Sequence, residues 1–118
     1  MELQLFQYNA FVTAVYDGDT CTVDIDLGLH TWIKNEKIRL FGINAPELRG
    51  KERPQGLLSR DFLRGLILNK EITLSTIKDA REKYGRYLGE IWVTTAKGTF
   101  VNVNDELVKK GFAVYKEY

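Results

Sequence analysis

The sequence predicts an α+β fold that is mainly β: a five-stranded barrel with a helix between the third and fourth strands and a second helix at the C-terminus. Three observations predict it. Five segments rich in β-branched and aromatic residues are separated by turn residues, one segment has the apolar spacing of an amphipathic helix, and another has helix start and stop signals. A chain of 118 residues fits one domain over 1–118 that buries roughly two thirds of its unfolded surface.

The first two strands are predicted over 8–16 and 20–27. In the second, apolar residues alternate with Asp24 and Asp26, a period-two pattern that indicates one buried face. The motif Asp-Gly-Asp at 17–19 separates the two segments. Because such residues favour tight connections, we expect the two strands to form a hairpin.

A third strand is predicted over 37–43, and Pro46 closes it. Proline cannot donate to a strand ladder, and it also pushes the residue before it out of helical space. A polar loop over 48–54 follows, and a helix is predicted after it. The apolar residues of this helical pattern are Leu58, Phe62, Leu63, Leu66 and Ile67.

The C-terminal half supplies the last strands and the second helix. Segments 71–77 and 86–95 are predicted as the fourth and fifth strands, and a turn at 97–98 leads to a further short apolar run. Asn102 starts the final helix with a capping-box pattern, and Gly111 stops it. Five strands with a helix between the third and fourth match the order of an OB-type barrel, which binds nucleic acids or sugars in many proteins. A fold alone does not fix function.

The composition bears on the cellular compartment. Cys21 is the only cysteine, so the chain forms no internal disulfide, and its position between threonines indicates a small core residue. The N-terminus lacks a leader pattern, and no apolar run approaches the ~20 residues needed to cross a bilayer. We expect a soluble, cytoplasmic monomer with no membrane partner.

The net charge of +1 hides an uneven distribution. Residues 17–26 carry only acidic charges, whereas 49–64 and 78–86 are mainly basic. An acidic hairpin between two basic segments suits a site for a metal and a phosphate. Solvated loops of opposite sign are the other explanation, and charge alone favours it.

Two polar residues near strand ends are candidates for binding a cation and a phosphate. Asp19 lies at the predicted hairpin tip, where a carboxylate can reach a hard cation, although the motif also suits a plain turn. Arg39 faces opposite to Leu40, so an inward Leu40 places the guanidinium on the outer, concave face, where it can bind a phosphate through two hydrogen bonds. A salt bridge to Glu36 or to an aspartate of the second strand explains Arg39 equally well.

Glu47 and segment 83–86 complete the polar candidates. Glu47 follows Pro46, so it is held rigidly on one side and faces solvent on the other, which suits a carboxylate that positions or deprotonates water. An ordinary surface glutamate has the same pattern. Tyr84 can stack on a base and Arg86 can bind a second phosphate oxygen, whereas a charged turn entering a strand is the simpler explanation.

Four motifs in order cover nearly the whole chain: DGDT from residue 17, RLFGINAPE from 39, EKYGRYLGEI from 82 and VNDELVKKGFA from 103. Together they resemble the staphylococcal nuclease (thermonuclease) family. The resemblance implies an OB-type barrel and an enzyme dependent on Ca²⁺, with Mg²⁺ or Mn²⁺ as other metals. It further implies hydrolysis of phosphodiester bonds in DNA, RNA or both, leaving 3′-phosphates.

The same resemblance implies roles for individual residues. Asp19 resembles the metal-binding aspartate of the family. Arg39 and Arg86 resemble its phosphate-binding arginines, and Glu47 resembles its general base or water-orienting residue. The substrate-binding residues implied are Lys83, Tyr84 and either Tyr115 or Tyr118 as a second stacking ring, unless both of these tyrosines only close the bottom of the barrel.

Asn44 departs from the family pattern, in which an aspartate ligates calcium and the next residue, here Ala45, adds a backbone carbonyl. Asparagine keeps an oxygen but removes one negative charge. Two unit charges 4 Å apart interact by about 4 kcal/mol at an effective dielectric of 20, so we expect weak metal binding that tightens with nucleotide. Asn44 also supports a rival hypothesis, a domain that binds nucleic acid or a protein partner without cutting.

Overall fold

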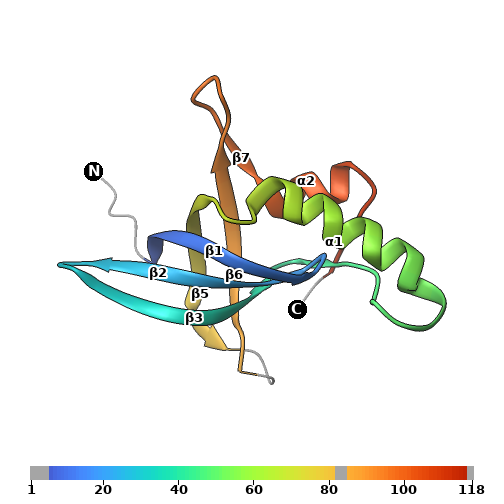
Figure 1. Cartoon of the computed structure of the whole chain (residues 1–118), viewed down its shortest axis with the longest axis horizontal. Helices are drawn as coiled ribbons and strands as arrows, with labels where there is room; N and C mark the ends of the chain where they lie inside the picture. Colours follow the sequence, from blue (N-terminus) through green and yellow to red (C-terminus); the bar gives the residue numbers. More distant parts are fainter. Residues whose placement is uncertain (1–5, 82–84, 117–118) are drawn as a thin grey trace.

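The computed structural model describes residues 6–81 and 85–116 of the chain (Figure 1). The barrel strands are β1 (Gln7–Asp17), β2 (Thr20–Gly28), β3 (Thr31–Leu40), β5 (Glu71–Arg81) and β6 (Tyr87–Thr94). The short strands are β4 (Ile43–Asn44), β7 (Phe100–Asn102) and β8 (Val114–Tyr115), and the helices are the 3-10 turn η1 (Gly50–Glu52), α1 (Arg53–Ile67) and α2 (Val103–Lys109).

The main sheet closes on itself. Its strand order is β3-β2-β1-β5-β6-β7, and β3 also pairs with β6 in parallel, with Arg39 opposite Leu88 and Leu40 opposite Gly89. The predicted fold class is therefore confirmed: a closed five-stranded barrel of the OB type, with α1 between the third and fourth barrel strands and α2 near the C-terminus. Figure 1 shows both helices on one side of the barrel and the tip of the β2–β3 hairpin on the other.

The barrel interior is filled by the inward residues of the strands and by two residues of α1. In β2, Val23 and Ile25 are buried while Asp24 and Asp26 face outward, as the alternation predicts. Cys21 is fully buried, and its burial raises the pKa of the thiol to about 12, which confirms it as a core residue.

Helix α1 packs four of its five predicted apolar residues against the core, and Leu58 is the exception. Its buried residues are Gly56, Ser59, Leu63 and Ile67, whereas Leu58 is 53% exposed. Gly56 and Ser59, in place of Leu58, lie on the buried side because these small residues let the helix approach the neighbouring elements. Phe62 is partly buried and stacks on Phe112, with ring centroids 4.4 Å apart.

Helix α2 has the predicted boundaries. The Asn102 side chain accepts a hydrogen bond of 3.1 Å from the Asp105 backbone N–H, which caps the first turn. Gly111 has φ +82, and the Phe112 N–H then donates to the Leu107 carbonyl at 2.8 Å. No helix among the residues that the structure describes is long and apolar enough to cross a membrane.

The third predicted strand is wrong at both ends. β3 begins at Thr31, because Leu29 and His30, with φ of 55 and 62, form a tight turn that joins it to β2. It ends at Leu40, because Gly42 has φ +79 and turns the chain. Ile43, predicted to end this strand, instead lies in β4, which pairs with β8.

Candidate nuclease site

Three segments distant in sequence meet at one end of the barrel. The β1–β2 turn carries Asp19 and Thr20, and Thr20 lies opposite Arg39 on β3. The Leu40 N–H donates to the Asp19 carbonyl at 2.8 Å, which ties the turn to the end of β3. Since β6 pairs with β3 at the barrel seam, Arg86, just before β6, lies beside the same strands.

Two glycines allow these segments to approach α1. A Cβ on Gly18 would lie 2.7 Å from the Cβ atoms of both Ala45 and Ser59, closer than such atoms can come. A Cβ on Gly56 would overlap the Glu47 carbonyl oxygen. The hairpin tip, the segment that carries Glu47 and the start of α1 therefore pack at distances that only glycine permits.

A buried cluster of polar side chains lies at the centre of the site. One oxygen of Asp19 accepts a 2.8 Å hydrogen bond from the Ala45 N–H and lies 3.3 Å from Nη2 of Arg39. Its other oxygen accepts a 3.2 Å hydrogen bond from the Thr20 hydroxyl. Nη2 of Arg39 also donates to the Asn44 amide oxygen at 2.7 Å. The two candidate metal ligands thus share one guanidinium nitrogen.

Arg39 is not displayed on an outer, concave face as expected. Only 7% of the residue is exposed, and its Nη1 donates to the Leu40 carbonyl at 2.8 Å. The alternative of a salt bridge is closer to the structure, although the partner is Asp19 in the turn before β2. The guanidinium lies beneath the surface because three oxygen acceptors surround it there, which offsets the cost of burying its charge.

The family resemblance implies a divalent cation at this point. Asp19, Asn44 and Ala45 offer a carboxylate, an amide oxygen and a backbone carbonyl, and hard cations such as Ca²⁺ prefer oxygen ligands of these types. The donor set therefore fits such a cation, but with one formal negative charge. Among the described residues, no group of three or more His, Cys, Asp or Glu side chains could hold a metal ion. A cation would have to compete with Arg39 for both side-chain oxygens.

A hollow of about 390 Å³ adjoins this cluster through Thr20, which lines the hollow and is hydrogen-bonded to Asp19. It contains two further candidate residues, Glu47 and Arg86. Nη1 of Arg86 donates to the Thr20 hydroxyl at 3.3 Å, so Thr20 connects the hollow to the buried Asp19. The residues that line the hollow are Tyr16, Asp17, Thr20, Glu47, Leu48, Arg49 and Arg86.

Arg49 also lines this hollow, although its sequence context indicates only that it belongs to a basic segment. Its Nε donates to the Glu47 carboxylate at 3.0 Å, and both side chains are largely exposed. The hydrogen bond and the charge of Glu47 raise the pKa of Arg49. Glu47 and Arg49 have opposite charges, are two positions apart and follow Pro46 in a loop. This pattern is the sequence signal that could have predicted the pair.

Asp17 gives the hollow a second carboxylate. One of its oxygens accepts a 3.0 Å hydrogen bond from the Asp19 N–H, which stabilises the hairpin turn. Burial and then the nearby charge of Asp19 raise the pKa of Asp17 from 3.8 to about 6. The carboxylates of Asp17 and Asp19 lie close together in the turn, so the charge of one disfavours the ionised form of the other.

Of the four residues expected to bind the nucleotide, the structure describes only Tyr115. Lys83, Tyr84 and Tyr118 lie outside the described residues. Tyr115 is 63% exposed, and its hydroxyl donates to the Asp105 carboxylate of α2 at 3.2 Å. Tyr115 is not among the residues that line the hollow.

Comparisons with known proteins agree with the fold. The family described as staphylococcal nuclease homologue matches residues 37–118. The chain is 32% identical over 110 residues to a thermonuclease of Staphylococcus hyicus and 29% identical over 110 residues to a thermonuclease of Staphylococcus intermedius. It is 31% identical over 116 residues to the endonuclease YhcR of Bacillus subtilis.

The barrel and its polar hollow define a domain of the nuclease-like OB class. The chain belongs to the staphylococcal nuclease homologue family. The alignments cover 91% of this chain, but it spans only 59% of the length of the two thermonucleases and 9% of the endonuclease.

Proposed function

We propose that this domain hydrolyses phosphodiester bonds of DNA, RNA or both, with a divalent cation, most simply Ca²⁺, and leaves 3′-phosphates. The observation that carries the proposal is the hollow lined by Glu47 and Arg86, because Thr20, which also lines it, is hydrogen-bonded to Asp19 of the cluster that contains Arg39 and Asn44. The thermonuclease and endonuclease relatives support the reaction class.

Each residue has a role that its position supports. Glu47, largely exposed beside the hollow, orients or deprotonates the attacking water. Arg86 binds the phosphate, and its charge stabilises the negative charge that develops on the phosphate oxygens. Arg39 fixes Asp19 and Asn44, and its bond to the neutral amide is the one that a phosphate oxygen would replace. Both arginines act electrostatically, because a guanidinium keeps its proton below pH ~12.

The cation would be held by Asp19, Asn44 and the Ala45 carbonyl. When bound, it would supply positive charge to the transferring phosphate. The chain itself offers only one formal charge for this purpose, so we propose that the ion and the substrate phosphate bind together. The phosphate would then restore the charge that an aspartate supplies at the Asn44 position in other family members.

The test is cleavage of a labelled oligonucleotide in Ca²⁺, Mg²⁺, Mn²⁺ or chelator. Glu47→Gln should lower the rate by roughly 10²-fold or more and leave oligonucleotide binding intact. Glu52→Gln is the matched control, because Glu52 is an exposed glutamate outside the hollow. Cleavage that survives both Glu47→Gln and Arg86→Ala would come from a contaminant and would contradict the proposal.

A second function is supported by one specific observation. The Asn44 amide is hydrogen-bonded to Arg39, and Glu47 is paired with Arg49, so both polar groups already have partners within the chain. This arrangement suits a domain that binds nucleic acid or a protein without cutting it. Oligonucleotide binding with no cleavage in any of the three metals would favour this second function.

A further inference from the structure

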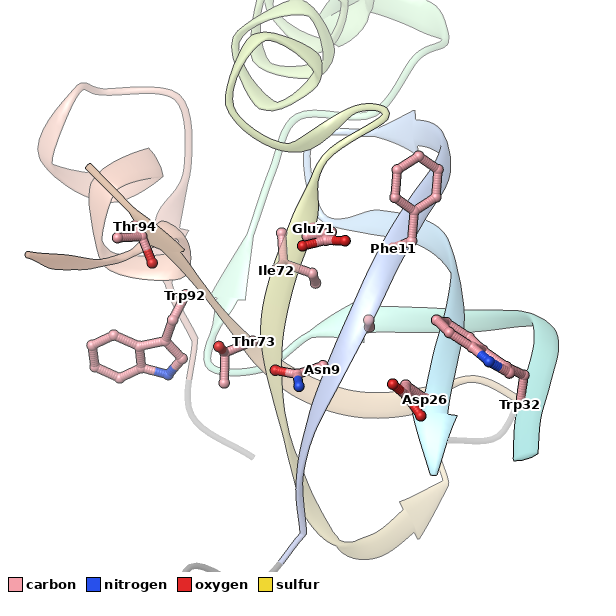
Figure 2. A pocket seen from close by; sticks show the side chains of 10 residues that line it. Asn9, Phe11, Asp26, Trp32, Glu71, Ile72, Thr73, Trp92 and Thr94 are labelled. Atoms are coloured by element: carbon pink, nitrogen blue, oxygen red, sulfur yellow. The ribbon is translucent and has the colours of Figure 1, made fainter. Parts of the chain in front are cut away.

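A row of side chains crosses the outer surface of the barrel, away from the hollow described above. Trp32 lies opposite Asp26, Asp26 opposite Asn9, Asn9 opposite Thr73, and Thr73 opposite Trp92. Directly opposed residues on neighbouring strands point to the same face. Figure 2 shows the two indoles at opposite ends, with Thr73, Asn9 and Asp26 between them. A depression of about 480 Å³ runs along this row.

The surface around the row is acidic. Two residues further along β1, Phe11 lies opposite both Asp24 on β2 and Glu71 on β5. Two residues in the opposite direction, Ser75 on β5 lies opposite Glu90 on β6. No lysine or arginine is found among the residues that line the depression, all of which the structure describes. We call this surface the Trp–acid face; its members are Asn9, Phe11, Asp24, Asp26, Trp32, Glu71, Thr73, Ser75, Glu90 and Trp92.

One end of the Trp–acid face already binds a cation from the chain itself. Nζ of Lys34 lies 5.0 Å from the centroid of a Trp32 ring and 3.5 Å from a carboxylate oxygen of Asp24. An indole with a carboxylate beside it attracts an ammonium through both its π face and the ionic contact. At the other end, Trp92 is two residues from Glu90 on β6 and lies opposite Thr73, which is two residues from Glu71 on β5. An indole on the same face as two carboxylates is therefore present at that end too, and Glu90 accepts a 3.1 Å hydrogen bond from Asn102.

We propose that the Trp–acid face binds an extended, arginine- or lysine-rich peptide segment of a protein partner. Charge complementarity selects this occupant: the carboxylates would repel the phosphates of a nucleic acid, whereas cationic side chains can contact Trp92, Glu71 and Asp26. Four strand spacings of about 4.8 Å give the row a span of about 19 Å, which about six extended residues can match. The inference is independent of the proposed nuclease activity.

The two tryptophans make the test direct, because they are the only two in the chain and both lie on this face. The intact protein is titrated with an unlabelled peptide that alternates arginine and glycine, and tryptophan emission is followed. A change in emission that saturates is expected. A peptide alternating glutamate and glycine, a neutral oligosaccharide and a single-stranded oligonucleotide serve as comparison ligands, and none of them should give this change.

Matched variants separate specific binding from general attraction. Asp26→Asn with Glu71→Gln removes two charges from the face and keeps the oxygen that accepts the Gly28 N–H. Glu52→Gln with Asp61→Asn removes two exposed charges from η1 and α1. The first pair should weaken peptide binding by about tenfold and the second by less than about twofold.

Trp92→Leu provides a second, uncharged test, with Trp32 still reporting by its emission. It should weaken peptide binding by about threefold to tenfold, since the cation loses its aromatic contact. Equal effects of the two double variants would overturn the proposal. So would emission that the basic peptide leaves unchanged, or emission that changes only with the oligosaccharide.

Discussion

At the scale of single residues, Asn44 determines the charge of the candidate metal site. Its amide oxygen accepts a hydrogen bond from Arg39, which also pairs with Asp19. The cluster therefore has one positive and one negative charge before any ion binds. A neutral cluster of this kind is stable without a cation, and it offers an incoming cation little net attraction.

Asn44→Asp should strengthen Ca²⁺ binding by about tenfold or more, because a second carboxylate adds a full charge next to the ion. Isothermal titration calorimetry measures the effect. Asn69→Asp, with the same charge change at an exposed position after α1, should leave the affinity unchanged. Nucleotide should tighten Ca²⁺ binding to the unmodified protein. Equal Ca²⁺ affinity for the unmodified protein and the Asn44→Asp variant would refute this account of the site.

Asp17 should make folding stability depend on pH. Its folded pKa of about 6 lies above the ordinary value of 3.8, so the folded protein binds the proton more tightly than the unfolded chain does. The free-energy cost of ionising Asp17 in the folded protein is absent below pH 3.8, grows as the pH rises, and is complete above about pH 6. Asp17→Asn should therefore stabilise the fold by about 1–2 kcal/mol near pH 8, allowing for partial solvent screening, and by nearly nothing near pH 3.

The measurement for Asp17→Asn is chemical denaturation at both pH values. The asparagine oxygen can still accept the Asp19 N–H, so the hairpin turn is kept. Glu52→Gln, at an exposed site, should change stability little at either pH. A gain from Asp17→Asn that is the same at both pH values would show that the carboxylate charge is not its cause.

At the scale of elements, the site depends on how closely α1 approaches the segment that carries Glu47. Gly56 and Gly65 lie on the same helix but in different surroundings. A Cβ on Gly56 would overlap the Glu47 carbonyl, whereas a Cβ on Gly65 would meet nothing within 4 Å. The helix-propensity gain of alanine is the same at both positions, so the pair isolates the effect of the contact.

Gly65→Ala should raise the free energy of unfolding by about 0.5–1 kcal/mol. Gly56→Ala should lower it by about 1–3 kcal/mol, because helix and loop must move apart. Since that movement displaces Glu47, oligonucleotide cleavage by Gly56→Ala should fall even at temperatures where the variant is fully folded. Denaturation and cleavage assays on both variants test this. Full activity in Gly56→Ala would mean that the position of the loop does not matter.

The elements differ in how far the sequence could predict them. The α2 boundaries were predictable because Asn102 and Gly111 act locally, through a cap and a left-handed turn. The β2–β3 hairpin was not, because its turn residues, Leu29 and His30, carry none of the usual signals for positive φ. The exposure of Leu58 in α1 was not predictable, because Gly56 and Ser59 are buried for steric reasons that hydrophobicity does not reveal.

The candidate site likewise has some features that the sequence could predict and others that it could not. Motif order predicted Asp19, Arg39, Glu47 and Arg86 as site residues, and in the structure these four residues lie at one end of the barrel. The burial of Arg39 could not be predicted, because it depends on acceptors that the fold collects from three segments. The pairing of Glu47 with Arg49 depends on side-chain conformations in an irregular loop, for which sequence periodicity carries no information.

At the scale of the whole molecule, the site depends on the seam where β3 meets β6. This parallel pairing has few residues, with Leu40 opposite Gly89 at its end, and Phe41 N–H donates to the Gly89 carbonyl at 2.8 Å. The seam brings Arg39 on β3 close to Arg86 at the start of β6. Closure of the barrel and assembly of the two arginines are therefore the same event.

The side chain of Asn104 on α2 hydrogen-bonds to backbone groups on both sides of this seam. It is 3% exposed, and its Nδ2 donates to the Phe41 carbonyl at 2.9 Å and to the Gly89 carbonyl at 3.1 Å. Its Oδ1 accepts the Ile91 N–H at 3.2 Å. One amide thus satisfies backbone groups on both sides of the closure, and the helix is bound to the barrel through it.

Asn104→Ala should lower the free energy of unfolding by about 2–4 kcal/mol, because it leaves buried backbone groups without partners, and should lower Tm by roughly 10 °C. Gln55→Ala, which removes an exposed amide from α1, should change Tm by no more than about 2 °C. Hydrogen exchange should show a loss of protection first at the Phe41 and Ile91 N–H groups, because Phe41 donates to Gly89 across the seam and Ile91 donates to Asn104. A uniform increase in exchange over the whole barrel would instead mean that the seam opens only with global unfolding, and that α2 does not fasten it separately.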